Sequence, residues 1–279
     1  MKYCDLHNPT SYSDGSDTPD ELCALAKKKG ISALAITDHN TVEGIFEFEK
    51  CAKEADLEYV LATELTTQYN GIELHLICMF INENNVHSVH DFCMDFRKRK
   101  DKINRKMAEA LSKDVCEISY DDMVARFGKN INRSHFAKIL IEKGIVETTD
   151  IAFDTILKEG NGYYFVTDRP CVLDAIKKVN SWGCVSVLAH PLLNFTKEQL
   201  EEFMPLAKEA GLVGMEAYYS KYTSDQVEYL LDLSEKYQII PSGGSDYHGE
   251  VKKGVGLGSA NVPYCCYEKL GKIAKKFNS

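Results

Sequence analysis

The first third of the chain alternates nearly continuous apolar runs with amphipathic segments. Short apolar runs predict buried strands, and segments with a helical period predict helices. The segment 18–30 also carries helix boundary signals, because Thr18 and Glu21 can form a capping box and Gly30 can end the helix. The expected order is strand 3–6, helix 18–30, strand 31–37, helix 42–55, strand 58–65 and strand 72–80.

The same alternation returns in the last third of the chain. Repeated βα units with continuous apolar strands predict an α/β fold with a parallel sheet covered on both faces, either closed as a barrel or open. The expected elements are helix 171–183, strand 184–190, helix 196–211, strand 212–218, helix 224–237 and strand 238–246.

The middle of the chain follows a different pattern. From about residue 85 to 167 the sequence predicts helices, including one over 89–113, and a strand only at 163–168. This change indicates a mostly helical insertion. We expect a barrel domain made of residues 1–98 and 168–279, and an insertion, residues 99–167, that covers the active site.

The acidic balance of the chain limits its partners. A net charge of −9 and a pI near 5.4 argue against a broad basic surface for long duplex nucleic acid or an anionic membrane. A small phosphorylated substrate, including a nucleotide or short RNA, remains compatible with this charge. The basic run 97–106 is interpreted as a solvated helix face, with a local basic wall for a nucleotide or an RNA end as the alternative.

The N-terminus lacks the layout of a secretion signal, and no run approaches the ~18 apolar residues of a membrane span. We therefore expect a cytoplasmic protein. The 10 cysteines are scattered and form no CxxC pair, so we interpret them as reduced thiols, mostly in the core. The oligomeric state is left open.

Histidines and isolated acids gather at the ends of the expected strands, where parallel α/β barrels build their active sites. A single histidine in such a place is usually an ordinary loop or core residue. So many imidazoles and carboxylates on one rim would lose solvation and repel one another unless cations neutralised them, which predicts a metal site. The residues are His7, Asp14, Asp38, His39, Glu64, His75, His190, Asp246 and His248.

Seven motifs carry a family resemblance: "DLHNPTSYSDG", "AITDHNT", "ATEL", "ELHLICMF", "INRSHFAK", "VLAHP" and "GGSDYHG". In these motifs and their order the chain resembles the PHP (polymerase and histidinol phosphatase) phosphoesterases, specifically the stand-alone members that act on nucleoside phosphates or short RNA ends. The resemblance implies a distorted (β/α)7 barrel with a mostly helical inserted subdomain, and two or three divalent metal ions, Mn, Fe or Zn, at the C-terminal rim.

By matching position, the resemblance implies three groups of metal ligands and a phosphate contact. The first metal would take His7, Glu64 and Asp246; the second would share Glu64 and add His75 and His190; the third would use Asp14, His39 and His248. Asp38 is expected to support a neighbouring ligand. Arg133 and His135 match positions that contact the substrate phosphate, and we expect Glu64, Arg133, His135 and His190 to be the catalytic residues.

The first motif departs from the His-x-His pattern of the family. It reads His7-Asn8-Pro9, so the first metal loses an imidazole that proline has no donor atom to replace. The first metal could bind more weakly, the site could work with two metals, or turnover could be lost while phosphate binding is kept. We favour residual or two-metal catalysis, since the other ligand positions are kept and two metals suffice for in-line hydrolysis.

The expected activity is hydrolysis of a phosphomonoester of a nucleotide (a 3′,5′-bisphosphate or a 5′-monophosphate) or of short RNA, by a water that the metals activate. Arg133 would stabilise charge on the phosphate oxygens and His135 would donate a hydrogen bond to them. Two alternatives are a catalytically impaired phosphate- or metal-binding protein on the same fold, motivated by Pro9, and a histidinol phosphate phosphatase.

Overall fold

The computed structural model describes residues 2–128 and 131–278, and it divides into two compact units. One unit combines Met1–Met94 with Arg169–Ser279, and the other is Asp95–Asp168. Helix α3 (Val86–Asp114) begins in the first unit and continues into the second. That the inserted helices cover the active site stays a prediction.

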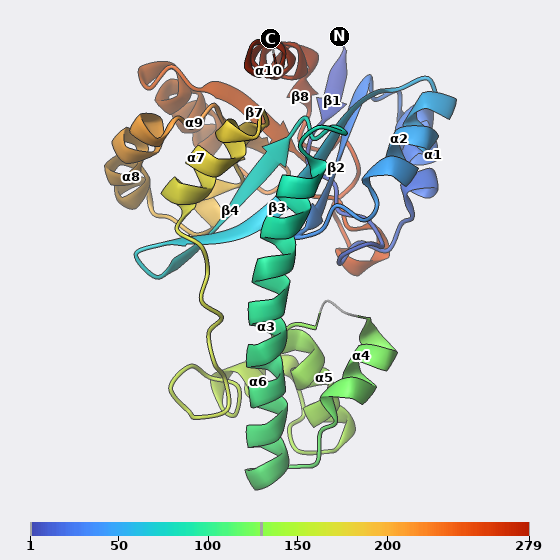
Figure 1. Cartoon of the computed structure of the whole chain (residues 1–279), viewed down its shortest axis with the longest axis vertical. Helices are drawn as coiled ribbons and strands as arrows, with labels where there is room; N and C mark the ends of the chain where they lie inside the picture. Colours follow the sequence, from blue (N-terminus) through green and yellow to red (C-terminus); the bar gives the residue numbers. More distant parts are fainter. Residues whose placement is uncertain (1, 129–130, 279) are drawn as a thin grey trace. The chain divides into compact units, whose positions relative to one another are not determined.

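The first unit is built around one eight-stranded sheet (Figure 1). Its order is β7-β6-β5-β4-β3-β2-β1-β8. Backbone hydrogen bonds from Leu6 to Gly243 and from Asp246 to His7 join the region after β1 to β7, so the sheet nearly closes into a barrel. The strands are β1 (Tyr3–Asp5), β2 (Ala33–His39), β3 (Glu58–Tyr69), β4 (Ile72–Met79), β5 (Val185–Leu188), β6 (Gly214–Tyr219), β7 (Ile240–Gly244) and β8 (Val262–Pro263).

The apolar pattern predicted a parallel sheet, but the sheet is mixed. β4 runs antiparallel to both β3 and β5, and β8 runs antiparallel to β1. The reason for β4 lies in the turn Asn70-Gly71, where both residues have positive φ (49° and 81°). A two-residue turn of this kind closes a hairpin, and it is too short for the crossover that parallel neighbours need. The start of β4, with His75, is thereby brought to the same end of the barrel as the C-terminal half of β3.

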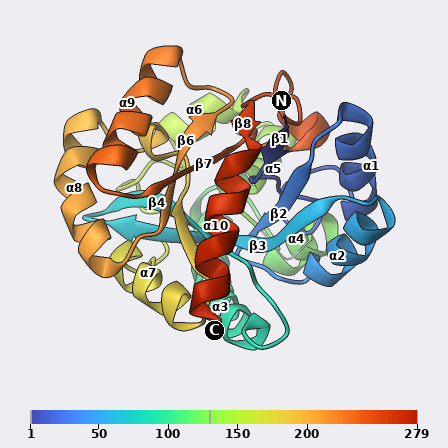
Figure 2. The ribbon, with the colours of Figure 1, turned by 90° about the horizontal axis from the view of Figure 1, so that it is seen from above.

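Two apolar clusters hold the first unit together. The larger lies between the strands and the helices α1 (Pro19–Lys29), α2 (Ile45–Glu54), α7 (Val172–Ser181), α8 (Lys197–Ala210) and α9 (Ser224–Lys236), which surround the sheet in Figure 2. The smaller fills the barrel interior and includes residues of α10 (Tyr264–Phe277), a helix that the sequence analysis did not anticipate. The capping box of α1 is confirmed, with Thr18 as N-cap, Glu21 at N3 and Gly30 as C-cap.

The second unit is helical and has its own apolar core. It contains most of α3 together with α4 (Tyr120–Phe127), α5 (Arg133–Glu142) and α6 (Thr149–Asp154). Its buried core includes Leu111, Phe136 and Leu140. The strand expected at 163–168 is wrong: the segment makes only an isolated bridge from Tyr164 to Glu159. Its aromatic side chains pack on the helical core instead of joining the sheet.

Two findings concern the chain as a whole. Among residues 2–128 and 131–278, no helix is both long enough and apolar enough to cross a membrane. No disulfide joins the cysteines of that part of the chain, and most of these thiols are buried.

Candidate metal centre

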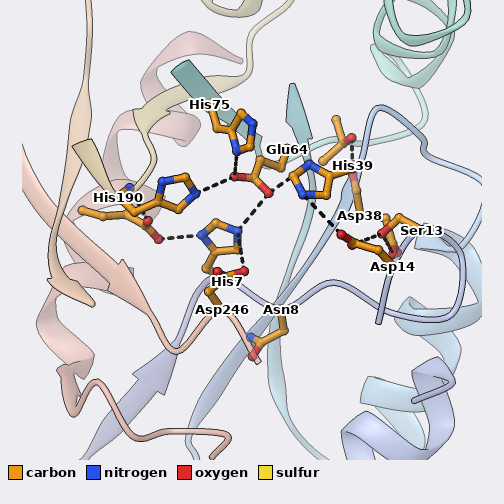
Figure 3. Close-up of polar contacts among 12 residues, drawn as sticks. His7, Asn8, Ser13, Asp14, Asp38, His39, Glu64, His75, His190 and Asp246 are labelled. Atoms are coloured by element: carbon orange, nitrogen blue, oxygen red, sulfur yellow. Dashed lines mark hydrogen bonds and ion pairs between the residues drawn. The ribbon is translucent and has the colours of Figure 1, made fainter. Parts of the chain in front are cut away.

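Glu64, in the middle of β3, lies at the centre of a cluster of imidazoles (Figure 3). Its side chain is 1% exposed. Oε1 lies 2.9 Å from His75 Nδ1 and 3.0 Å from His190 Nε2. Oε2 lies 3.1 Å from His7 Nε2 and 3.2 Å from His39 Nδ1. Each carboxylate oxygen thus lies within 3.2 Å of two ring nitrogens, and Glu64 is the side chain that all four imidazoles contact.

Strand geometry explains how these side chains meet. His39 ends β2, and it pairs with Glu64 across the β2–β3 ladder. His7 and His190 each follow the last residue of their strand, β1 or β5, by two positions. His190 has φ 25°, a backbone conformation that is uncommon for a residue with a side chain, and such conformations occur often at functional sites.

Asp246, two residues after β7, joins the cluster beside His7. Its Oδ1 lies 3.6 Å from His7 Nε2. Its Oδ2 accepts hydrogen bonds from Tyr219 Oη at 2.8 Å and from Lys252 Nζ at 2.6 Å. The expected first group, His7 with Glu64 and Asp246, is therefore close together, and one Asp246 oxygen is already engaged by two donors.

Asp14, His39 and His248 also approach one another. Asp14 Oδ2 lies 3.8 Å from His39 Nε2 and 3.5 Å from His248 Nε2. Ligand atoms close enough to share one ion are found in two groups within the described residues: His7, Glu64 and His190, and His39, Glu64 and His75. These groups divide the histidines differently from the family pattern, in which His190 joins His75 and His39 joins Asp14. Which residues share which ion stays a prediction.

Asp38 holds the loop that carries Asp14. Asp38 is almost fully buried and accepts hydrogen bonds from the Thr10 backbone at 2.8 Å, from Thr10 Oγ1 at 2.7 Å and from Ser13 Oγ at 2.7 Å. Ser13 Oγ also lies 3.3 Å from Asp14 Oδ1. These contacts agree with a supporting role for Asp38.

The charges in the cluster depend strongly on one another. Burial alone would raise the pKa of Glu64, but the imidazoles of His39, His7 and His75 hold that pKa well below its usual range. Burial lowers the pKa of His75, but Glu64 and Glu73 together outweigh burial and raise the pKa to about 10. For His39 the effect of burial is the stronger one, and its pKa is lowered. A buried carboxylate surrounded by imidazoles therefore remains ionised.

The donor atoms fit divalent metal ions. Four buried atoms of the cluster have no hydrogen-bond partner among the described residues: His7 Nε2, His39 Nδ1, Glu64 Oε2 and His190 Nδ1. Three of these atoms lie together, because His7 Nε2 and His39 Nδ1 both face Glu64 Oε2. Buried polar atoms normally have a partner, and imidazole and carboxylate donors suit Mn²⁺, Fe²⁺ or Zn²⁺. The residues present are therefore those that a metal centre would need.

A family model described as the PHP domain matches residues 5–166, which is more than half of the chain. The chain belongs to the PHP domain family. That the cluster around Glu64 is the metal site of this PHP protein stays a prediction. The barrel that carries this site is confirmed as a PHP-type fold by comparison with solved structures.

Three relatives illustrate the likeness. A 5′-3′ exoribonuclease of Haemophilus influenzae is 28% identical over 88% of this chain and 90% of its own. A 3′,5′-nucleoside bisphosphate phosphatase of Chromobacterium violaceum is 24% identical over 95% of this chain and 94% of its own. A solved structure from Bifidobacterium adolescentis, assigned as a metal-dependent phosphoesterase, has a TM-score of 0.81 and 28% identity, and covers 98% of this chain and 96% of its own. The expectation of a metal-dependent phosphoesterase agrees with these relatives.

Arg133 and His135 lie at the start of α5 in the helical unit. The guanidinium of Arg133 stacks on Phe153 and Tyr164, 4.1 and 4.7 Å from the ring centres, and donates to the Phe153 carbonyl at 2.8 Å. His135 Nδ1 accepts from the Asn132 backbone at 3.1 Å. Burial, followed by Lys100 and Lys138, lowers the pKa of His135. That both residues contact the substrate phosphate stays a prediction.

Further residues that contact the expected ligands were not singled out from the sequence, among them Glu73, whose Oε1 lies 3.1 Å from His75 Nε2. Glu216, on β6, contacts His7 and His190, while Tyr219 and Lys252 contact Asp246. A signal for Glu216 did exist, because it is the only charged residue in the strand Gly214–Tyr219. Tyr219 and Lys252 had no comparable signal, since tyrosines and lysines are common along the chain.

Proposed function

We propose that this PHP protein hydrolyses, in a metal-dependent reaction, either a phosphomonoester of a nucleotide or the terminal phosphodiester bonds of short RNA. The observation that supports the proposal most directly is the contact of Glu64 with four imidazoles at 2.9 to 3.2 Å in a buried site. Such a cluster has the ligands for at least two adjacent divalent ions.

The proposal gives each ligand a definite task. Glu64, His7, His39, His75 and His190 would hold the ions, together with Asp246, Asp14 and His248 beside them. When bound, these ions supply Lewis-acid stabilisation of the phosphate and a water whose pKa is near neutrality. The chain itself keeps the ligand atoms in place: Asp38 holds the Asp14 loop, and Tyr219 holds Asp246.

Arg133 is assigned the substrate phosphate in this proposal. Stacking on Phe153 and Tyr164 fixes the plane of its guanidinium, and one of its nitrogens donates to the Phe153 carbonyl. The planar fork of a guanidinium suits the oxygens of a phosphate. His135 is assigned a hydrogen bond to the same phosphate.

The substrate class follows from chemistry and from the relatives together. The names of two full-length relatives refer to RNA and to nucleoside bisphosphates, which share a phosphate ester on a ribose. We therefore assign the protein a nucleoside 3′,5′-bisphosphate, a nucleoside 5′-monophosphate or the end of a short RNA as substrate.

The test uses the purified full-length chain with added Mn²⁺. Inorganic phosphate release is measured from adenosine 3′,5′-bisphosphate, and nucleotide release is measured from a short 5′-phosphorylated RNA. A chelated sample is the blank, and the Glu64→Gln variant is the control. We expect release that both chelation and the variant abolish. If the protein binds Mn²⁺ but releases nothing from either substrate, the proposal fails and a metal- or phosphate-binding protein without turnover, as Pro9 could produce, takes its place.

A further inference from the structure

Glu216 is a buried carboxylate that contacts two expected metal ligands. Its side chain is 0% exposed, and it lies on β6, between the strands β5 and β7. Oε1 lies 3.0 Å from His7 Nδ1. Oε2 accepts a hydrogen bond from the backbone N–H of His190 at 2.7 Å. Both carboxylate oxygens are therefore engaged by the metal cluster, although Glu216 is not itself in either group of candidate ligands.

The contact with His7 determines which ring nitrogen is available to a metal. An ionised carboxylate can only accept hydrogen bonds, so the His7 Nδ1 that faces it carries the proton. In a neutral ring the lone pair then belongs to Nε2. That atom faces two other carboxylates, with Glu64 Oε2 at 3.1 Å and Asp246 Oδ1 at 3.6 Å. The His7 atom that would bind the metal therefore faces the two carboxylates that are expected to share the first ion with it.

The contact with His190 acts on the backbone. His190 has φ 25°, which is outside the usual regions for a residue with a side chain. The hydrogen bond from its N–H to Glu216 stabilises this conformation, and the ring then points its Nε2 at Glu64 Oε1, 3.0 Å away. Glu216 thus orients one ligand through its ring and another through its main chain.

We infer that Glu216 is a positioning residue for the metal centre: it holds His7 in the tautomer that presents Nε2 to the metal, and it holds the His190 turn. This inference rests on the proposed metal-dependent function. It has particular weight here because Pro9 removes a second imidazole from the first motif, so that the first metal depends more heavily on the orientation of His7.

The amide variant Glu216→Gln tests the inference sharply. If its amide oxygen accepts from the His190 N–H, its NH₂ group faces His7 Nδ1 and requires that nitrogen to be an acceptor. The proton of His7 then moves to Nε2, the atom that should bind metal. If the amide is turned the other way, its NH₂ group opposes the His190 N–H. Loss of such a supporting partner typically lowers metal affinity about 10- to 100-fold.

The matched control is Met215→Ala. Met215 is the neighbouring residue on β6, is equally buried, and belongs to the outer apolar cluster. Its truncation weakens packing on the same strand without touching His7 or His190. Mn²⁺ affinity is measured without substrate, from the signal of the free ion in electron paramagnetic resonance, and thermal unfolding of the metal-free proteins is recorded beside it.

We expect a 10- to 100-fold (order of magnitude) weaker affinity in Glu216→Gln and an affinity near that of wild type in Met215→Ala. Equal affinity in Glu216→Gln and wild type, or equal losses in both variants, would overturn the inference. Should Glu216→Gln fail to fold, ¹⁵N NMR of Zn²⁺-loaded wild type decides, because the inference requires His7 to bind through Nε2 and to be protonated on Nδ1. If wild type binds no metal, the proposed function itself fails, and this result is distinct from the others.

Discussion

Replacing Glu64 by Gln should abolish the response of the protein to metal. The change keeps the size of the side chain but removes its charge and turns one acceptor into an NH₂ donor. That donor would lie close to two ring nitrogens, either those of His75 and His190 at 2.9 and 3.0 Å or those of His7 and His39 at 3.1 and 3.2 Å. Both candidate ligand groups contain Glu64, so a single substitution impairs both.

The expected rise in melting temperature follows from the linkage between metal binding and folding. An ion present at about 100 times its dissociation constant stabilises the folded state by about 2.7 kcal/mol per site. Two sites that share Glu64 contribute about 5 kcal/mol together. In a chain of this size each kcal/mol shifts the melting temperature by about 2–4 °C, so wild type should gain on the order of 10–20 °C with metal.

The assay is calorimetric unfolding of metal-free and Mn²⁺-saturated protein. Glu64→Gln should show almost no metal-induced rise in melting temperature. Thr67→Val, in the same strand, is the control: it removes a buried hydrogen bond from Thr67 Oγ1 to the Leu74 carbonyl (2.7 Å), which costs about 1 kcal/mol, but it should keep the full rise. A Glu64→Gln protein that gains half or more of the wild-type rise would refute the assignment of Glu64 as the shared ligand.

Three further predictions concern the same unit. Pro9→His should restore an imidazole, so that the variant retains more metal per chain after dialysis than wild type, as measured by elemental analysis; unchanged content would contradict the proposed ligand loss. Because the raised pKa of His75, about 10, keeps its ring protonated at neutral pH in the metal-free protein, a metal must displace that proton. Apparent Mn²⁺ affinity should therefore rise with pH from about 6.5 to 8.5, by up to about tenfold per pH unit for each displaced proton, and a pH-independent affinity would speak against it. Asp5→Asn should lower the free energy of unfolding in urea by about 1.5–3 kcal/mol. Buried Asp5 accepts hydrogen bonds from Ser245 N and Oγ (2.8 and 2.6 Å) and from Gly258 N (2.7 Å), and an amide cannot satisfy all three donors. An unchanged free energy of unfolding would contradict this prediction.

Local patterns predicted some elements well and others badly. The boundaries of α1 could be predicted because Thr18, Glu21 and Gly30 act within a few residues of one another. The direction of β4 could also have been predicted, since Asn70-Gly71 is a strong hairpin signal, but continuous apolar strands outweighed it. The segment 163–168 has the composition of a strand, yet its aromatic residues found burial against helices, because tertiary packing overrides strand propensity.

The sequence by itself determined the order of the βα units and the chemistry available at the strand ends, because periodicity and residue type are local properties. Only the tertiary structure decided which of these groups meet. Glu216 reaches His7 across 209 positions and His190 across 26, through strands whose neighbours are set by the order and near closure of the sheet. Glu64 likewise meets imidazoles from β2 and β4 and from the segments that follow β1 and β5. Contacts between residues so far apart depend on strand register and on side-chain direction, and neither is encoded in any one segment.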